Sequence, residues 1–520
     1  MNIFHTLIQT FHRSSGDGTD NAASTARTLD SSRGLMGAIM ILNLLFLEIL
    51  ACIGATSVAD GVHRSLWMFF VYCSMSLIYK LAAGNKIFSN KVFLVSSLAI
   101  ALHLGIVVML ANYMRSMPEW NYLMILLVPY TLAPIIVSVL LGKAMGTFTA
   151  VCVTLYGLIL MPDPSPVSPL NYICLSLLTG LIGVVLTGNL RKREQILSTG
   201  FIVGIVTFAA AFCLGALGSG DEWFRARNLG WDIGSAIGMS FFVSVFIGGI
   251  LPLLEHMFHI STPITWQEQG DMNLPLLKDL QLHAPGTFHH SVIVSLLAAN
   301  AAKAIGANSM QCSVAALYHD IGKTKYPQYF AENIPSSAAS PHSELTPDMS
   351  AKLIIGHVTE GVELAKKHNL GPSIISIIKE HHGRSLAYYF YRQALDKFEA
   401  AMKDFEAGLI DTKPAPVDDE QFRYPGPGPQ SREAGIVSLA DIVESATRSL
   451  KNPTAEEMAN KVDELIRERL LSGHLEDSNL TLGDIHKIRD SFLETLKTMA
   501  HNRPEYPKHE TEPAPKKATA

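Results

Sequence analysis

Seven residues between His290 and Asp441 have side chains that bind metal ions, and chance rarely produces them in this order. Imidazole nitrogens suit transition metals better than Mg²⁺, and one carboxylate can bridge two metal ions. Two neighbouring divalent ions can activate water and neutralise a phosphate group, which is the chemistry of phosphoester hydrolysis. The candidates are His290 in PGTFHHS, His319 and Asp320 in YHDIGK, His357 in IIGHVTEG, His381 and His382 in KEHHG, and Asp441 in SLADIVES.

Two pairs of neighbouring candidates, the His-Asp of YHDIGK and the His-His of KEHHG, pose a geometric problem. Adjacent residues on an α-helix point about 100° apart, so neighbours in mid-helix rarely reach one site. Each pair has a glycine within three residues, Gly322 or Gly383, where a helix can end and let both side chains converge. The other three candidates come from separate predicted helices. His289 precedes His290, and the residue types leave open which of these two is the ligand.

After residue 283 the apolar residues recur with the 3.6-residue period of amphipathic helices, and no strand pattern persists. We therefore predict an all-α domain over 284–501, a helical bundle whose core holds a dinuclear metal site. The segment 409–432 is rich in Pro, Gly and Asp and is predicted to be a loop. The predicted helices cover 291–305, 310–319, 347–368, 372–382, 387–408, 431–450, 454–471 and 482–500.

The first half of the chain is far more apolar, which accounts for the 48% hydrophobic content and the positive mean hydropathy. We count about eight apolar stretches of roughly 17 to 23 residues, the length that crosses a bilayer. Their uniform length and short polar gaps argue against buried helices of a soluble protein. The segment 35–256 is therefore predicted to be a polytopic transmembrane helical bundle, with spans at 35–55, 66–82, 92–114, 123–141, 145–161, 172–190, 196–217 and 233–254.

Basic residues in alternate loops orient these spans, because positively charged loops stay in the cytoplasm. Lys86, Lys91, Lys143 and the run 191–193 fall on one side, whereas the loop 161–171 carries almost no positive charge. We therefore predict that both termini and the all-α domain are cytoplasmic. A cleaved signal peptide is the alternative for the first span. Its apolar core is too long for one, and a polar segment of about 34 residues precedes it.

The remaining segments are predicted to be tails and a connector. Residues 1–34 and 502–520 are poor in large apolar side chains, so we expect disordered tails. The connector, 257–283, contains Pro263 and Pro275, which we expect to break helices. It also carries a leucine-rich patch that we expect to dock onto a neighbouring surface, formed by Leu274, Leu276, Leu277 and Leu280.

Charge and cysteine usage exclude some classes of function. A net charge of −5 does not indicate a polyanionic partner, and none of the six cysteines forms a CxxC pair. Neither a disulfide framework nor a zinc-thiolate site is therefore supported. Glu48 and His103 lie within predicted spans, where snorkelling or a mutual hydrogen bond would satisfy them. We favour a structural role for both over transport or sensing.

The motifs extend well beyond the seven candidates. The chain reads LPLLEHMFHIST, APGTFHHS, AIGAN, ALYHDIGK, YFAEN, HVTEGVELA, IKEHHG, YFYRQA and YPGPGPQSREAGIVSLADIVESATRSL in this order. This text resembles the membrane-anchored, seven-transmembrane HD-domain phosphohydrolases, which include bacterial cyclic-di-AMP phosphodiesterases. The resemblance covers 251–450 closely and the membrane block more loosely.

The resemblance implies a cofactor, two divalent transition-metal ions (Fe or Mn), and a role for each candidate. It implies His290 rather than His289 as the ligand, and Asp320 as the bridge between two ions. His319, Asp320 and Lys323 would be catalytic, although Lys323 by itself reads equally well as a solvated lysine at a helix end. One ion would be held by His290, His319, Asp320 and Asp441, and the other by Asp320, His357, His381 and His382.

The resemblance also implies a substrate and a location. We expect a multi-pass protein of the cell inner (plasma) membrane that hydrolyses cyclic-di-AMP to linear pApA, with water activated by two metal ions. The expected partners are a cyclic dinucleotide and the lipid bilayer, without polymeric nucleic acid, and a homodimer stays open. This chain departs from the family in one respect. The family carries a large extracellular domain between its first two spans, whereas here only residues 56–65 separate the first two predicted spans.

Other functions remain as alternatives. Relatives that cleave cyclic-di-GMP carry a Gly-Tyr-Pro element after the His-His pair, and GRSLAYYFYRQA follows His382 here. Cyclic-di-GMP or (p)ppGpp hydrolysis is the alternative among enzymes. A nucleotide-sensing membrane receptor with a degenerate site is the alternative outside them. A transporter would need broken helices at the membrane midplane, for which only Pro129 and Pro134 qualify.

Overall fold

The computed structural model describes residues 32–53, 55–83, 89–117, 123–161, 167–188, 190, 192–217, 226–335, 339–450 and 453–501. Nearly all of the predicted tails, 1–34 and 502–520, therefore lies outside the described residues. Within the described ranges the chain is helical, and the only β-type pairing there is an isolated bridge between Leu386 and Arg423. The predicted all-α fold is confirmed.

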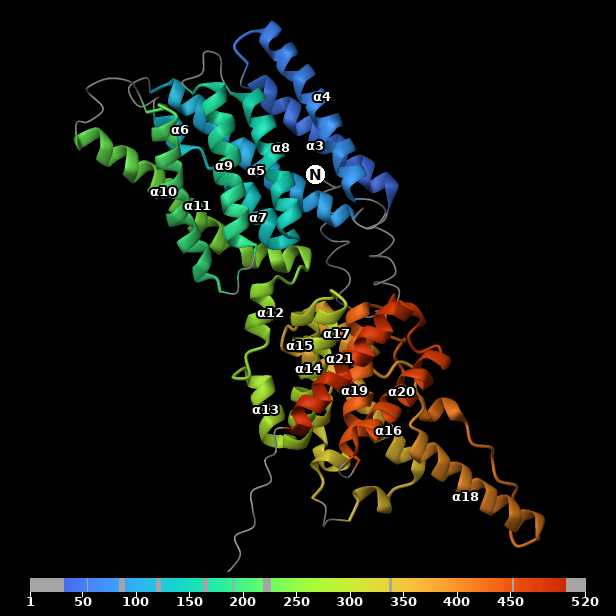
Figure 1. The fold of residues 1–520 in the computed structure, drawn as a ribbon. Coiled ribbons are helices and arrows are strands. Elements are labelled where there is room, and N and C mark those ends of the chain that lie inside the picture. The colour runs from blue at the N-terminus through green and yellow to red at the C-terminus, as the bar shows by residue number, and fades with distance from the viewer. Residues whose placement is uncertain are drawn as a thin grey trace, which may run out of the picture. The chain divides into compact units, whose positions relative to one another are not determined.

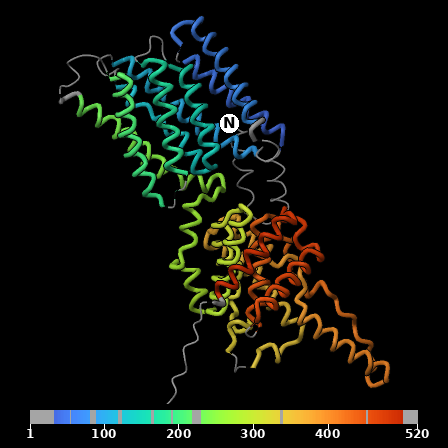
Figure 2. The backbone as a smooth tube through the Cα atoms, in the orientation of Figure 1, coloured from blue at the N-terminus to red at the C-terminus, as the bar shows by residue number. Residues whose placement is uncertain are grey.

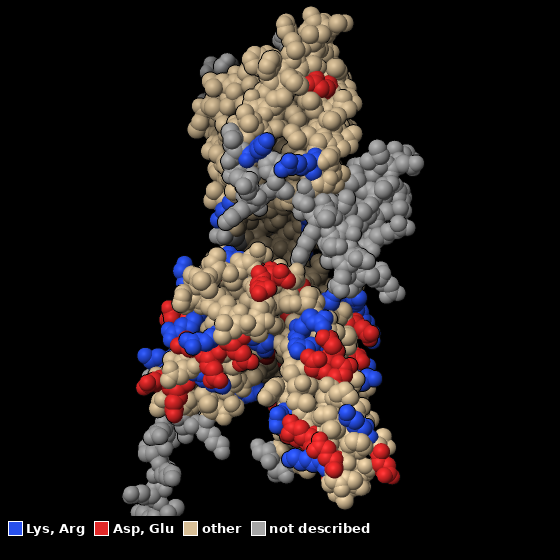
Figure 3. All heavy atoms as spheres, turned by 90° about the vertical axis from the view of Figure 1, so that its right-hand side faces the viewer, with Lys and Arg blue, Asp and Glu red and all other residues tan. Residues whose placement is uncertain are grey.

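The chain divides into two compact units, 1–265 and 266–520, each with its own apolar core (Figures 1 and 2). Their surfaces differ in composition. In Figure 3 the first unit shows few charged side chains, whereas lysine, arginine, aspartate and glutamate are mixed over the second. This contrast matches the predicted division into a membrane block and a water-exposed domain.

The first unit is a bundle of long apolar helices (Figure 1). Many of their large apolar side chains point outward, such as Met109 at 74% exposure and Val185 at 68%. Outward apolar surface of this extent suits lipid rather than water. The helices are α3 Arg33–Ile53, α4 Val58–Ala83, α5 Asn90–Arg115, α6 Met124–Leu127, α7 Leu132–Leu141, α8 Lys143–Leu160, α9 Pro169–Thr187, α10 Glu194–Cys213 and α11 Ala226–Phe258.

Seven helical segments in the described part of the chain are long and apolar enough to cross a membrane, where about eight were predicted. The difference is α4, which contains the predicted span 66–82. This helix is less apolar overall because it carries charged residues such as Arg64, which pairs with Asp60 at 2.7 Å. Its side chains Trp67 and Phe70 are nevertheless 64% and 62% exposed. The eighth span stays a prediction.

The fourth predicted span is a broken helix. Helix α6 ends at Leu127 and α7 begins at Leu132, with Pro129 in the non-helical link. The combined segment Met124–Leu141 is 89% buried, more than any other candidate span. Because hydrocarbon offers no hydrogen-bond partners, an interrupted helix is stable only where protein surrounds it. The break therefore needs its central place in the bundle.

The two ionisable residues in the spans do not satisfy each other. His103 is fully buried, and neither ring nitrogen has a hydrogen-bond partner among the described residues. Of the two alternatives, snorkelling or a mutual hydrogen bond, the hydrogen bond between His103 and Glu48 is therefore absent. Glu48 is half-buried on α3, where its stem can carry the carboxylate toward a more polar environment.

The second unit is a helical bundle around a single apolar core. Helix α14 is central: it packs against α15, α19 and α21, and short 3₁₀ helices complete the connections. The helices are α12 Pro263–Gln269, α13 Pro275–His283, α14 Pro285–Ala304, α15 Ser309–Tyr318, η5 Ile321–Lys325, η6 Pro327–Tyr329, η7 Ala331–Asn333, η8 Pro341–Glu344, α16 Pro347–Lys367, α17 Pro372–Glu380, α18 Tyr388–Glu406, η9 Asp419–Phe422, α19 Arg432–Arg448, α20 Ala455–Leu471, η10 Glu476–Ser478 and α21 Leu482–His501.

The prolines of the predicted connector begin helices instead of breaking them. Pro263 opens α12 and Pro275 opens α13, because proline is well tolerated in the first helical turn, where its missing N–H has no partner to lose. Leu276, Leu277 and Leu280 of α13 are buried in the core of the second unit. The leucine-rich patch therefore docks onto the domain that follows it.

Proline also explains the largest error in a predicted helix start. Helix α14 begins at Pro285, six residues before the predicted start at 291, so His290 lies inside the helix rather than before it. The other predicted helices of this unit agree with the structure within about two residues at each end. The predicted loop 409–432 is non-helical except for η9 and the first residue of α19.

Candidate metal centre

The His319–Asp320 pair lies where a helix ends. Helix α15 ends at Tyr318, His319 is the residue after it, and the 3₁₀ helix η5 follows from Ile321. Gly322 allows this turn to pack closely, because a Cβ there would lie 1.9 Å from the backbone oxygen of His357. The change of helix type turns both side chains toward one site, as the nearby glycine predicted.

The His381–His382 pair is arranged in the same way. Helix α17 ends at Glu380, and Gly383 adopts a φ of +53°, a conformation that glycine reaches without strain. The two imidazole rings lie 4.1 Å apart between centroids. His381 is fully buried, whereas the side chain of His382 is 19% exposed. Both predicted glycine-assisted turns are therefore present.

The other three candidates come from three separate helices. His290 lies on α14, His357 on α16 and Asp441 on α19, and all three are buried. His289 points away and is exposed. The structure thus brings all seven predicted residues together and turns His290, not His289, toward the cluster.

The two oxygens of Asp320 face different neighbours. Oδ2 lies 3.3 Å from Nε2 of His319 and 3.5 Å from Nε2 of His290. Oδ1 lies 3.2 Å from Nε2 of His357 and 3.7 Å from Nε2 of His381. The seven residues form two groups with candidate ligand atoms within 4.8 Å of one another, His290 with His319 and Asp441, and Asp320 with His357, His381 and His382. Asp320 therefore lies between the two groups.

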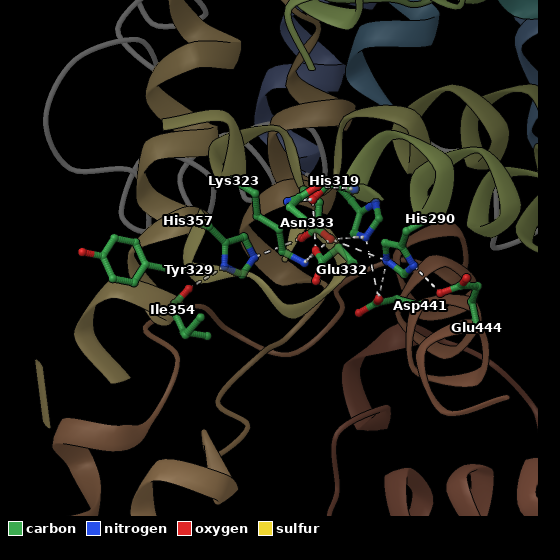
Figure 4. A network of polar contacts seen from close by, with 12 residues as sticks. His290, His319, Lys323, Tyr329, Glu332, Asn333, Ile354, His357, Asp441 and Glu444 are labelled. Atoms are coloured by element: carbon green, nitrogen blue, oxygen red, sulfur yellow. Dashed lines mark hydrogen bonds and ion pairs between the residues drawn. The ribbon is translucent and has the colours of Figure 1, made fainter. Parts of the chain in front are cut away.

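Four of the histidines have a fixed orientation, because each Nδ1 is held by an oxygen. Figure 4 labels three of them, His290, His319 and His357. Carbonyls and carboxylates only accept hydrogen bonds, so each Nδ1 donates and leaves the Nε2 lone pair free. Backbone carbonyls three residues earlier accept from His319 at 2.7 Å, His357 at 2.6 Å and His381 at 2.8 Å. His290 instead donates to the buried carboxylate of Glu444.

Lys323 is buried in an ion network, not solvated at a helix end. Its Nζ lies 2.6 Å from Asp320 Oδ2 and 2.9 Å from Glu332 Oε1. Glu332 also accepts a hydrogen bond from Thr287 at 3.0 Å, and Asn333 donates to Thr287 at 3.0 Å. Burial alone would lower the pKa of Lys323, but the carboxylates of Asp320 and Glu332 raise it above its ordinary value. The lysine therefore stays cationic beside the cluster.

The cluster attracts positive charge. Burial would raise the pKa of Asp320, but His319 and Lys323 hold it well below its usual range. Burial would lower the pKa of His319, but Asp320 and Asp441 raise it to about 10. Burial and neighbouring histidines instead lower the pKa values of His381 and His382. The anionic side of the cluster, around Asp320 and Asp441, therefore favours bound cations.

The donor set fits divalent transition metals. Both oxygens of Asp320 and Nε2 of His319 are buried without a hydrogen bond of good geometry to any described residue, despite their close ion-pair neighbours. Orphaned lone pairs at this depth cost free energy unless a cation takes them up. Their mixture of imidazole and carboxylate matches iron, manganese or zinc better than Mg²⁺.

Three residues near the cluster were missed by the sequence analysis. Glu444 lies one helical turn after Asp441, and this i+3 spacing was a usable signal. Glu332 lies in YFAEN, one of the motifs that carry the family resemblance, but no role was predicted for it. Tyr424 stacks on His382 with ring centroids 4.2 Å apart, and no spacing rule could place it there.

A pocket of about 870 Å³ adjoins the cluster and is lined by His357 itself. Gly322 and Phe330 line the same end, and the exposed side of α16 forms a wall. Volumes of this order hold small-molecule ligands in proteins. One residue of the cluster, His357, therefore borders a cavity large enough for a nucleotide.

Comparison with known families agrees with this division. Residues 62–262 match the family described as "7TM receptor with intracellular HD hydrolase", and residues 287–446 match the HD domain. The chain is therefore similar to the membrane-anchored HD-domain proteins in both of its units. The membrane match begins within α4, the helix whose span stays a prediction. The protein is therefore a multi-pass membrane protein with an HD domain.

Relatives with assigned names are similar over much of this chain. It is 32% identical over 425 residues to cyclic-di-AMP phosphodiesterase PgpH of Bacillus subtilis, covering 81% of this chain and 56% of that protein. It is 33% identical over 385 residues to PgpH of Listeria monocytogenes, covering 73% and 50%. The chain thus spans about half the length of the curated relatives it matches.

Solved structures are similar to the second unit. The HD domain of L. monocytogenes PgpH is 38% identical, with all of that chain and 44% of this one covered and a TM-score of 0.39. The same domain in complex with cyclic-di-AMP is 37% identical, with 98% and 44% covered and a TM-score of 0.40.

Proposed function

We propose that this protein is a membrane-bound phosphodiesterase that hydrolyses cyclic-di-AMP to linear pApA. The observation that carries the proposal is the convergence of seven ligand-type side chains in two groups on either side of Asp320, beside a pocket of about 870 Å³. The names of the two PgpH relatives, both cyclic-di-AMP phosphodiesterases, support this substrate class.

The metal ions in this proposal are iron or manganese. His290, His319, Asp320 and Asp441 would hold one ion, and Asp320, His357, His381 and His382 the other. Two such ions, when bound, supply Lewis-acid activation of water and neutralise phosphate charge.

Residues of this chain would orient the metal-ligand atoms and balance the charge of the phosphate. The four Nδ1–H hydrogen bonds keep the Nε2 atoms of His290, His319, His357 and His381 aimed inward. Lys323 would balance charge on the phosphate from its place between Asp320 and Glu332. Water adds to phosphorus, the bond to the 3′-oxygen breaks, and this oxygen leaves with a proton. The second phosphodiester stays intact, which gives pApA.

A product assay tests the proposal. Full-length protein in detergent or nanodiscs, loaded with Mn²⁺ or Fe²⁺, should convert cyclic-di-AMP to pApA faster than it converts cyclic-di-GMP or (p)ppGpp. An Asp320→Asn variant serves as the inactive control. Tight binding of cyclic-di-AMP without turnover would instead favour the receptor. Faster turnover of another nucleotide would move the activity to that substrate.

The location of the HD domain is part of the same proposal. We place it in the cytoplasm, at the plasma (inner) membrane, because the basic run 191–193 and Lys143 fall on the side of the membrane that leads to α12. A reporter fused after residue 520 should report a cytoplasmic environment. A reporter that is active only when exported would contradict this orientation. The homodimer stays a prediction.

A further inference from the structure

One helix of the HD domain contains a glycine that the fold does not require. Gly356 lies in the middle of α16, and its φ is not positive. Among the described residues, no atom lies within 4 Å of the position that a Cβ would occupy. Glycine inside a helix destabilises it relative to alanine. Neither backbone conformation nor packing against the described residues therefore explains this glycine.

The other glycines near the cluster behave differently. A Cβ on Gly322 would lie 1.9 Å from the backbone oxygen of His357, and a Cβ on Gly361 would lie 3.0 Å from Ile378. Those two positions need glycine because neighbouring elements pack there. Gly356 instead faces the pocket of about 870 Å³, next in sequence to His357. Its bare backbone leaves room for something other than protein.

The wall around this opening suits a flat aromatic group. Met349 and Leu353 lie on the same side of α16, and Tyr326 and Phe330, which flank η6, line the pocket as well. Met349 and Tyr326 are 53% and 43% exposed, so part of their apolar surface can contact a ligand, although Lys325 Nζ lies over the Tyr326 ring at 5.7 Å from its centroid. Apolar and aromatic faces around a gap free of side chains are what a nucleobase needs for stacking.

Most of the charged groups in the pocket are already partnered. Arg423 binds Asp419 through Nε at 3.0 Å and through Nη2 at 2.7 Å. Lys325 pairs with Glu360, and Thr346 hydrogen-bonds Asp348 at the start of α16. The guanidinium of Arg423 is therefore not available to bind a base with both of its parallel N–H groups.

Lys352 and the side-chain amide of Gln421 are the polar groups left at the pocket edge. Among the described residues the amide of Gln421 makes a single long contact, 3.4 Å from Nε2 to Asp418. A glutamine amide offers one donor and one acceptor, which matches N7 and N6 of adenine. Guanine presents two acceptors, O6 and N7, which suit the paired donors of arginine. The pocket edge thus matches adenine better than guanine.

We propose that this pocket is an adenine subsite, with the backbone at Gly356 as its floor and Gln421 as the residue that selects the base. The subsite rests on the proposed function, because the base belongs to the nucleotide whose phosphate lies at the cluster. The subsite adds a residue that distinguishes adenine from guanine, which none of the seven cluster residues does.

The first test fills the floor of the subsite in the full-length protein. Gly356→Ala should raise the melting temperature while it weakens cyclic-di-AMP binding, and Gly356→Leu should raise KM for cyclic-di-AMP by about tenfold or more. Turnover of bis(p-nitrophenyl) phosphate, which has no base, should fall far less. Lys366→Leu, on an exposed part of α16 away from the pocket, is the matched control.

The second test changes the base preference. Gln421→Ala should lower the ratio of kcat/KM for cyclic-di-AMP over cyclic-di-GMP by about tenfold, and Gln421→Arg should lower it further. Unchanged KM in Gly356→Leu, or an equal loss on both substrates together with lost metal, would overturn the subsite. So would an unchanged ratio in both Gln421 variants.

The two proposals fail separately. If the wild type turns over no cyclic dinucleotide, the proposed function is wrong. The subsite is then tested by equilibrium binding of cyclic-di-AMP, which Gly356→Leu must still weaken by about tenfold. Equal binding by wild type and Gly356→Leu would overturn the subsite as well.

Discussion

The two halves of the cluster use the same ligand types but are supported differently. In the half with His357 and His381, both Nδ1 atoms donate to backbone carbonyls of their own helices. In the half with His290 and His319, His319 likewise donates to a backbone carbonyl, but His290 donates to the carboxylate of Glu444, 3% exposed and contributed by another helix. Asp441 also belongs to this half, 3.1 Å from Nε2 of His290. The half with His290 is therefore the more anionic.

Helix geometry explains part of this difference. His319 and His381 directly follow the ends of α15 and α17, where the last carbonyls have no intrahelical partner and can accept from imidazole. His357 lies in the middle of α16 and still donates to the carbonyl of Ile354. His290, in the second turn of α14, differs because its Nδ1 meets the carboxylate of Glu444 from α19. A carboxylate that accepts a hydrogen bond from one ring nitrogen of a histidine makes the other ring nitrogen a more basic ligand. We therefore expect tighter metal binding in the His290 half.

The largest effect is expected at the residue the two halves share. Asp320→Ala should abolish phosphodiesterase activity and remove metal from both halves, because Oδ1 and Oδ2 face different groups. The protein should still fold, since Lys323 keeps its ion pair with Glu332 at 2.9 Å and the apolar core is unchanged. Elemental analysis and circular dichroism check this. Two metal equivalents retained per chain would contradict a shared aspartate.

Removing a ligand from one half should cost less metal. His290→Ala and His357→Ala should each lose about one metal equivalent, with partial loss from the other half through Asp320. Activity should be lost in both, because hydrolysis needs both ions. The measurement is metal content by elemental analysis after gel filtration. Identical, complete loss of metal in both variants would mean that the halves are not separable.

The support of His290 should have an intermediate effect. Glu444→Ala leaves a buried Nδ1–H without an acceptor, so metal affinity of the His290 half should fall by about 10- to 100-fold. Glu444→Gln keeps an acceptor without the charge, so its metal affinity should lie between those of the alanine variant and the wild type. Competition with a chelator measures both. Wild-type metal affinity in both variants would show that the difference between the halves has no functional consequence.

The smallest effect is expected next to His290. His289→Ala changes an exposed side chain that points away from the cluster, so metal content and activity should stay near wild type. Paired assays of His289→Ala and His290→Ala compare the two directly. If the His289 variant lost metal while the His290 variant kept it, His289 rather than His290 would be the ligand.

The amount of the site that sequence could predict depends on how local each feature is. The turns after His319 and His381 were predictable because a glycine stands two or three residues away. The start of α14 was not, because Pro285 is compatible with either a break or a first helical turn, and packing against α15, α19 and α21 favours the helix. Glu444 shares a helix with Asp441, but only the fold brings it to His290.

The sequence by itself determined the residue types, their order and the helical periods, since these depend on neighbours within one or two turns. It also determined the division between apolar spans and a water-exposed domain. Only the tertiary structure decided which oxygen of Asp320 faces which group, and that His290 meets Asp441 across 151 residues. Only the tertiary structure shows that Gly356 faces an open pocket. Contacts between distant segments follow from how whole helices pack, and no local pattern of residues encodes that geometry.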